Sequence, residues 1–236
     1  MRYALQVQYI GKNYAGSQIQ FENGKEISIP TVQGELERAI RTLICGKSAT
    51  DIRPIKTVFS GRTDKGVNAK GQVVHFDLEK QFVASKFLYS LNEILPNDIS
   101  VSDLRQVDKS FHAQKSAKSR YYRYEFINRK CHNAFDGDLM RVKFPVSIER
   151  MQESLDYLLG EHDFTSFKSS GTLNPSKVCI ISRAEVHKVD DRVIIDIVGN
   201  RFLYNMVRTI VGTLLEIEGH NLSSEHMRYV LEAKDR

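Results

Sequence analysis

The sequence lacks tryptophan altogether and contains only three cysteines among its 236 residues. Cys45, Cys131 and Cys179 are widely spaced and form no CxxC pair or Cys/His cluster, so neither a zinc site nor a disulfide framework is indicated. Apolar runs are short, since none reaches the roughly 20 residues that a membrane helix needs. The N-terminus alternates in polarity and lacks the basic and then apolar segments of a signal peptide. Reduced thiols in a cytoplasmic protein are therefore the simplest expectation.

Hydrophobic and charged residues are both well represented, at 41% and 27% of the chain, which is ordinary for a globular protein. The length suits one large domain or two small ones, each able to bury a core. The formal net charge is +5 and the isoelectric point is about 9.0. This excess of Lys and Arg is compatible with a nucleic-acid partner, and also with simple solubility.

Hydrophobic periodicity divides the chain into two halves of similar architecture. The predicted strands are residues 3–9, 57–60, 72–78, 99–107, 120–127, 180–188 and 192–198, the last two forming a hairpin that turns at Asp190 and Asp191. The predicted helices are residues 31–43, 86–94, 148–159, 202–216 and 224–231. The pattern predicts an α+β fold with an N-terminal domain over residues 1–108 and a C-terminal domain over residues 109–236, whose strands could share one sheet.

A glycine-rich loop lies between the second and third predicted strands. Residues 61–72 read G-R-T-D-K-G-V-N-A-K-G-Q, and Asp64 is the one carboxylate among them. The adjacent cations of Arg62 and Lys65 favour the ionised form, which suits a nucleophile or a base. Glycine and aspartate alone would favour a surface turn with a solvated carboxylate.

The full string through Val73 resembles the active-site motif of the TruA family of tRNA pseudouridine synthases. Further segments follow the family's order: T-V-Q-G-E-L-E, L-N-x-x-L-P, F-H-A with S-A and R-x-Y-x-Y, G-E-H-D-F-T-S-F, and F-L-x-x-M-V-R-x-x-V-G, at residues 31–37, 91–96, 111–124, 160–167 and 202–212. The resemblance thus covers nearly the whole chain. It implies the pseudouridine synthase fold, with two similar halves and mainly antiparallel sheets around a central cleft that binds RNA.

The family's functional residues fall on four positions of this sequence. The resemblance implies that Asp64 is the catalytic residue and that Arg62 acts in base flipping or on RNA. It also implies that Tyr122 stacks on the target uracil and that Arg208 forms an ion pair with Asp64. From the residues alone, Arg62 and Arg208 could be surface cations, and Tyr122 could be a core residue of a strand. Weaker candidates for phosphate contacts are Lys12, Lys65, Lys70, Arg120 and Arg123.

The implied activity is the conversion of uridine to pseudouridine at positions 38, 39 and 40 of the anticodon stem-loop of tRNA, without a cofactor or a metal. The implied assembly is a homodimer that holds tRNA across both subunits. Two alternatives stay open: a pseudouridine synthase with another RNA target, and a tRNA-binding protein of impaired activity.

The sequence departs from the family pattern at a few positions. Ile10 and Ser17 replace an Asp and a Trp in the loop after the first strand, and Asn68 stands where His is usual. These positions are expected to contact RNA. The chain ends at Arg236, where the family continues into a final strand that lines the pocket, so this strand is expected to be missing.

Overall fold

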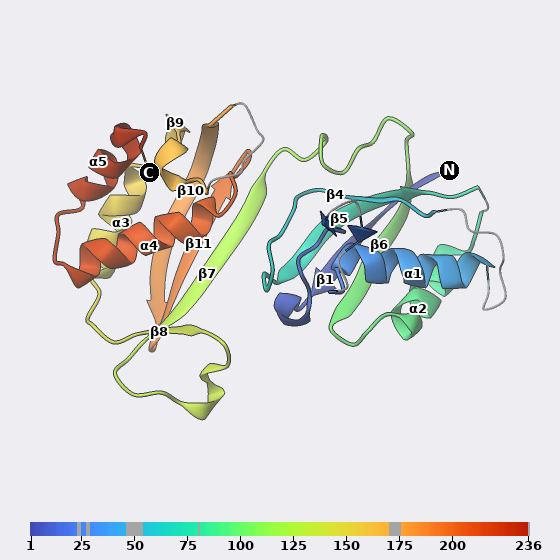
Figure 1. Ribbon diagram of the computed structural model, residues 1–236, viewed down its shortest axis with the longest axis horizontal. Helices are drawn as coiled ribbons and strands as arrows, with labels where there is room; N and C mark the ends of the chain where they lie inside the picture. Colours follow the sequence, from blue (N-terminus) through green and yellow to red (C-terminus); the bar gives the residue numbers. More distant parts are fainter. Residues whose placement is uncertain (23–24, 27–28, 46–53, 80, 170–175, 236) are drawn as a thin grey trace. The chain divides into compact units, whose positions relative to one another are not determined.

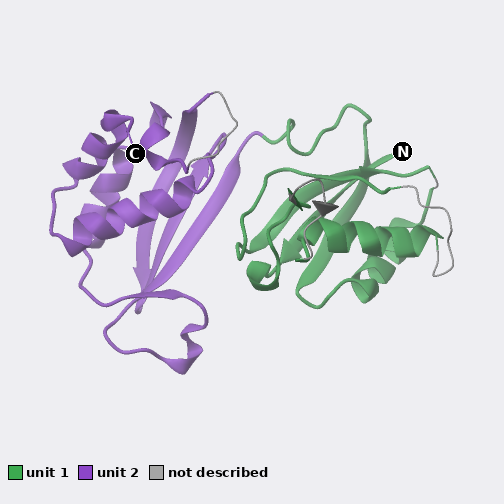
Figure 2. Cartoon of the chain, viewed as in Figure 1, with its two compact units in different colours: residues 1–117 green, residues 118–236 purple. Residues whose placement is uncertain are grey.

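The computed structural model describes residues 1–236 except 23–24, 27–28, 46–53, 80, 170–175 and 236. The chain divides into two compact units, Met1–Ala117 and Lys118–Arg236 (Figure 2). Each unit has its own sheet, helices and hydrophobic core. No helix within the described ranges has both the length and the apolar character to span a bilayer.

Unit 1 is built on one antiparallel sheet with strand order β4-β5-β1-β6. Two helices pack on it and on each other (Figure 1). Its elements are β1 (Arg2–Tyr9), η1 (Gly11–Asn13), β2 (Phe21–Glu22), β3 (Lys25–Glu26), α1 (Val32–Cys45), β4 (Thr57–Phe59), β5 (Ala69–Asp77), α2 (Ala84–Ile94) and β6 (Ile99–Val107).

The core of unit 1 follows from the two periodicities. In β1 the alternate residues Tyr3, Leu5, Val7 and Tyr9 are buried, as a strand with one covered face requires. The buried side of α1 repeats at helical spacing and is formed by Val32, Leu36, Ala39 and Ile40. Both patterns were readable in the sequence, and the predicted strands and helices of this half are confirmed with shifted ends.

Unit 2 has a five-stranded sheet with strand order β8-β7-β11-β10-β9. All its pairs are antiparallel except β7 with β8. Its elements are β7 (Arg120–Asn128), η2 (Ala134–Asp136), β8 (Met140–Val142), α3 (Ile148–Asp156), β9 (Gly160–Asp163), η3 (Thr165–Phe167), β10 (Val178–Val189), β11 (Arg192–Gly199), α4 (Met206–Gly219) and α5 (Glu225–Ala233).

The predicted α+β class is confirmed, and so is the β10–β11 hairpin, which turns through Asp190 in a left-handed conformation. The prediction missed β8 and β9, which are three and four residues long. The helix predicted from residue 202 begins at Met206. The described strands of unit 1 and those of unit 2 fall in separate sheet orders, β4-β5-β1-β6 and β8-β7-β11-β10-β9.

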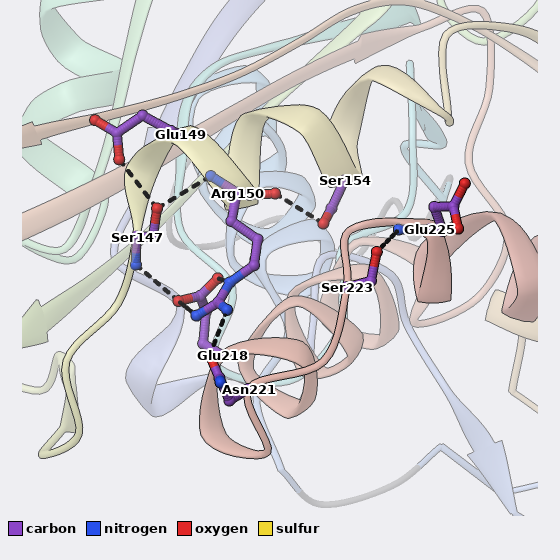
Figure 3. A network of polar contacts seen from close by, with 8 residues as sticks. All are labelled: Ser147, Glu149, Arg150, Ser154, Glu218, Asn221, Ser223 and Glu225. Carbon is purple, nitrogen blue, oxygen red and sulfur yellow. Dashed lines mark hydrogen bonds and ion pairs between the residues drawn. The ribbon is translucent and has the colours of Figure 1, made fainter.

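A network of polar contacts ties α3 to the end of α4 (Figure 3). The side chain of Glu218 is fully buried, and its carboxylate accepts hydrogen bonds from Arg150 Nε at 2.8 Å and Nη2 at 2.9 Å. The backbone N–H of Ser147 donates to the same carboxylate at 2.7 Å, and Arg150 Nη1 also donates to Asn221 at 2.6 Å. The acid lies in the last turn of α4 and the base in the first turn of α3, where each opposes its own helix dipole. The pair therefore offsets two unfavourable placements at once.

Candidate active site

The loop that carries Asp64 connects two neighbouring antiparallel strands, β4 and β5. The N–H of Ser60 donates to the carbonyl of Val73 at 2.8 Å, which closes the base of the loop. At its tip, the N–H of Val67 donates to the carbonyl of Asp64 at 3.1 Å, and Gly66 has a φ of 78°. A turn with positive φ at its third residue favours glycine there. The half-buried Asp64 is thus the first residue of a tight turn with defined geometry.

Thr63, the residue before Asp64, forms hydrogen bonds with Ser17 through both its backbone carbonyl and its backbone N–H. The N–H of Ser17 donates to the carbonyl of Thr63 at 3.1 Å, and the N–H of Thr63 donates to Ser17 Oγ at 2.9 Å. The hydroxyl groups of Tyr9 and Thr63 are hydrogen-bonded at 2.7 Å. Three hydrogen bonds therefore fix the backbone and side chain of Thr63.

Gln72 on β5 completes this support. Its Nε2 donates to the carbonyl of Gly61 at 2.9 Å and to the hydroxyl of Tyr9 at 3.2 Å, and its Oε1 accepts from Ser60 Oγ at 2.7 Å. Burial raises the pKa of Tyr9 above its ordinary value, and this effect outweighs the smaller lowering by the hydrogen bonds of its hydroxyl. The Tyr9 hydroxyl therefore stays protonated and able to donate at neutral pH.

The segment before α1 lies directly against the loop. A Cβ at Gly11 would be 2.1 Å from the carbonyl oxygen of Val67, and one at Gly16 would be 2.7 Å from that of Thr63. Gly16 also has a φ of 129°, which other residues rarely adopt. The N–H of Gly11 donates to Asn68 Oδ1 at 2.8 Å. Glycine is required at both positions because the two backbones touch.

Two of the departures from the family pattern therefore support the loop. Ser17 has no exposed surface, so the expectation that its side chain contacts RNA is wrong for this unit. Asn68 is exposed, but its side-chain oxygen is bonded to Gly11. Sequence reasoning gave neither residue a structural role, because their partners lie 46 and 57 positions away.

The predicted cations of unit 1 lie on its surface. Arg62 and Lys65 flank Asp64 and are exposed, as are Lys12 and Lys70. Three of them belong to the loop or the start of β5, and Lys12 belongs to η1, whose Gly11 contacts the loop. Exposed cations thus lie in and beside the loop that carries Asp64, and such a surface favours a polyanionic ligand.

In unit 2 the predicted stacking residue Tyr122 lies on β7 and is half-buried. The edge of its ring meets Phe202, with the ring centroids 4.8 Å apart. Tyr124 packs against the hydrophobic core, whereas Tyr121 is exposed and donates from its hydroxyl to Asp196 at 2.7 Å. Tyr122 and Tyr124 therefore share the more buried face of β7, and Tyr121 lies on the other face.

Arg208 is the third residue of α4 and is exposed. Within its own unit Arg208 is therefore a surface cation, as the residues alone allowed. A cation in the first turn opposes the helix dipole, so this position does not serve the stability of α4. The N-terminus of the helix and the guanidinium together make a positively charged spot that suits an anion.

The remaining phosphate candidates differ in their engagement. Arg120 donates to the carbonyl of Asn200 at 2.6 Å. Arg123 donates through Nε and Nη2 to the buried carboxylate of Asp196, at 2.8 and 2.9 Å, and the hydrogen bond with that carboxylate raises the pKa of Arg123. The charge of Arg123 is thus largely compensated by Asp196. Arg123 is therefore the weaker of these two candidates for a phosphate contact.

The site residues divide between the units: Arg62 and Asp64 belong to unit 1, and Tyr122 and Arg208 to unit 2. Unit 1 presents a carboxylate in a rigid, cationic loop. Unit 2 carries the aromatic ring of Tyr122 and the cation of Arg208 on its own elements, β7 and α4.

Comparison with known proteins bears on what such residues do. A family model described as "tRNA pseudouridine synthase" matches residues 155–236. A tRNA pseudouridine synthase A of Colwellia psychrerythraea is 38% identical over 100% of this chain and 86% of its own length. Proteins of the same name from Halalkalibacterium halodurans and Anoxybacillus flavithermus are 40% and 41% identical, over 100% and 98% of this chain and 85% and 89% of their own lengths.

Proposed function

The chain belongs to the tRNA pseudouridine synthase A family and is an isomerase, and on that basis we propose that it converts uridine to pseudouridine in the anticodon stem-loop of tRNA, at positions 38, 39 and 40. The observation that carries the proposal is the loop of residues 61–72, in which Asp64 begins a hydrogen-bonded turn and has the exposed Arg62 and Lys65 near it in the sequence. The names of the bacterial relatives support tRNA as the substrate, and we propose the cytoplasm as the place of action.

In this reaction the glycosidic bond breaks, the uracil rotates, and a carbon–carbon bond to the sugar forms. Atoms and electrons balance within the nucleotide, so the reaction itself calls for no cofactor. The enzyme must present a carboxylate, retain the freed base and keep water away. We assign the carboxylate to Asp64. Attack on the sugar, addition to the ring and removal of a sugar proton all begin from its ionised form, which Arg62 and Lys65 favour.

A uridine in a stem has to leave the helix before a carboxylate can reach it, at a cost of a few kcal/mol. Arg62 is exposed beside Asp64, and its planar guanidinium can enter the vacated position or hold a phosphate. Tyr122 offers a half-buried ring for the extruded uracil. Base–aromatic stacking of this kind contributes roughly 1–3 kcal/mol per base.

Arg208 is proposed to pair with Asp64 in the assembled site. Its place in the first turn of α4, against the helix dipole, supports a role outside its own helix. A bidentate guanidinium would fix the orientation of the carboxylate as well as its charge. We further propose a homodimer, because one subunit could grip the body of the tRNA while the other acts on the stem-loop.

The decisive experiment compares Asp64→Asn with the matched variant Asp103→Asn in unit 1. Asp103 is an exposed aspartate on β6 in a left-handed conformation that Asn accepts readily. Pseudouridine is mapped at positions 38–40 of tRNA from cells that carry each variant. We expect complete loss with Asp64→Asn and normal conversion with Asp103→Asn.

Persistent conversion in Asp64→Asn would remove the catalytic role of Asp64. A wild-type protein that binds tRNA without converting any uridine would instead favour the binding-protein alternative. Conversion at other sites would favour a different RNA target.

A further inference from the structure

An aromatic ring stands almost free in solvent on the connection between β7 and β8. Phe135 lies in the short helix η2 and is 92% exposed, the highest value among the large hydrophobic side chains of the described residues. In Figure 1 this connection is the loop beside β8 that extends away from the sheet of unit 2. Large aromatic side chains are normally at least half covered in a folded protein, so such exposure calls for an explanation.

Hydrogen bonds hold the backbone that carries the ring. The N–H of Phe135 donates to Asn133 Oδ1 at 3.0 Å, and the N–H of Asn133 donates to Asp136 Oδ2 at 3.1 Å, which together make a capping box. Arg129 donates to Asp136 at 2.6 Å and to Asp191 at 3.2 Å, and so ties the loop to the β10–β11 turn. The Arg129 guanidinium lowers the pKa of Asp136, so this contact is kept over a wide pH range. Because the backbone at Phe135 is already ordered, binding through this residue costs little backbone freedom.

The segment that carries the ring, residues 129–143, is basic, with four Lys and Arg residues against the two acids Asp136 and Asp138. Exposed Lys130 and Lys143 lie on either side of it in the sequence, and Arg141 donates to the carbonyl of Lys130 at 3.3 Å, which draws the two ends of the loop together. The carboxylate of Asp136 forms an ion pair with Arg129. The centre of a protein–protein interface is typically apolar and poor in charge, whereas an aromatic ring among cations is the arrangement that binds single-stranded nucleic acid.

From these observations we infer that Phe135 is a stacking platform for an unpaired base of the tRNA substrate, separate from the uridine that is converted, with Lys130, Arg141 and Lys143 contacting the flanking phosphates. The inference rests on the proposed function, because it assumes that tRNA is the ligand. It adds a contact of binding and specificity, and no step of the reaction.

The test uses three substitutions of the full-length protein, Phe135→Ala, Phe135→Leu and Phe135→Tyr, with Tyr229→Ala as the matched control. Tyr229 is a 69% exposed aromatic residue on α5 of the same unit. Because stacking needs a flat ring, Ala and Leu should each raise the KM for tRNA roughly tenfold, and Tyr should leave it within about twofold of wild type. The kcat should stay unchanged in all three variants, and Tyr229→Ala should behave as wild type.

The substitutions also separate RNA from a protein partner. A partner with an apolar pocket would accept Leu nearly as well as Phe, so full retention of the KM by Phe135→Leu would overturn the inference. Dissociation of a dimer by Phe135→Ala in sedimentation would show that the ring contacts a second copy, and would overturn it too. An unchanged KM in Phe135→Ala, with wild-type protein active and Asp64→Asn inactive in the same assay, would refute the stacking role and leave the proposed function intact.

Discussion

Replacing Arg150 with methionine should destabilise unit 2 strongly, although Arg150 itself is partly exposed. The substitution keeps most of the apolar stem and removes the guanidinium that makes two hydrogen bonds with Glu218. The Glu218 carboxylate then stays buried, with only the Ser147 N–H as a bonded partner among the contacts of Figure 3. The reverse substitution, Glu218→Leu, leaves a guanidinium that water can reach and that still bonds to Asn221. Replacing Arg150 should therefore lower the stability of unit 2 more than replacing Glu218.

The expected magnitudes follow from burial. Removing the counter-ion of a buried carboxylate lowers the free energy of unfolding by about 3–5 kcal/mol. Because Glu218 keeps its hydrogen bond from the Ser147 N–H, we expect Arg150→Met to cost about 3 kcal/mol, at the lower end of this range. For a unit of roughly 120 residues this corresponds to a fall in Tm of about 12 °C. Glu218→Leu should lower the Tm by about half as much, since its partner can rehydrate.

Differential scanning calorimetry is the suitable measurement, because the two units can unfold in separate transitions. The double variant Arg150→Met with Glu218→Leu should recover most of the loss, since a packed apolar pair often replaces a buried ion pair at little cost. A single Arg150→Met variant that melts within about 3 °C of wild type would refute the reasoning. So would a double variant no more stable than that single variant.

Three further predictions concern the site and its support. Ser17→Ala should lower kcat about tenfold without changing tRNA affinity, because the Thr63 N–H loses its acceptor and the turn that carries Asp64 becomes less ordered. Single-turnover rates at saturating tRNA test this prediction, and an unchanged rate would contradict it. Arg208→Lys should keep tRNA binding and lose turnover, because a lysine cannot reproduce bidentate geometry; equal turnover in the two proteins would exclude the pairing. Burial and a nearby cation lower the pKa of His75, whose Nδ1 accepts from the Ala113 N–H at 3.1 Å, so the unfolded state binds the proton more readily. Unit 1 should therefore lose stability as the pH falls below about 6.5, and His75→Gln should flatten this dependence in melting curves between pH 5 and 8.

The sequence predicted the regular elements well where a period is repeated several times. The eight residues of β1 and the fourteen of α1 each show their buried side several times over. The strands β8 and β9 are too short to display alternation, and their positions at the edges of the sheet depend on partners elsewhere in the chain. Local pattern carries no information about such pairing.

The candidate site shows the same division. Asp64 could be proposed from the sequence because the whole motif is continuous. The support from Ser17 was missed because the hydrogen bonds that define it join residues 46 positions apart. For Arg208 the residues alone left a surface cation open, and the structure places it on the exposed side of α4. Exposure depends on which face of a helix packs, and one cation cannot be assigned to a face from its neighbours alone.

The close contact of Gly11 and Gly16 with the loop has a consequence for how unit 1 folds. The loop backbone reaches its final shape only against residues 11–17, and those residues are brought there by pairing of β1 with β5. Local turn formation is fast, but contacts between segments about 50 residues apart must wait for the chain to close a large loop. In refolding experiments, catalytic competence should thus return later than the secondary structure of unit 1. The carboxylate is positioned only in a chain whose first sheet is already complete.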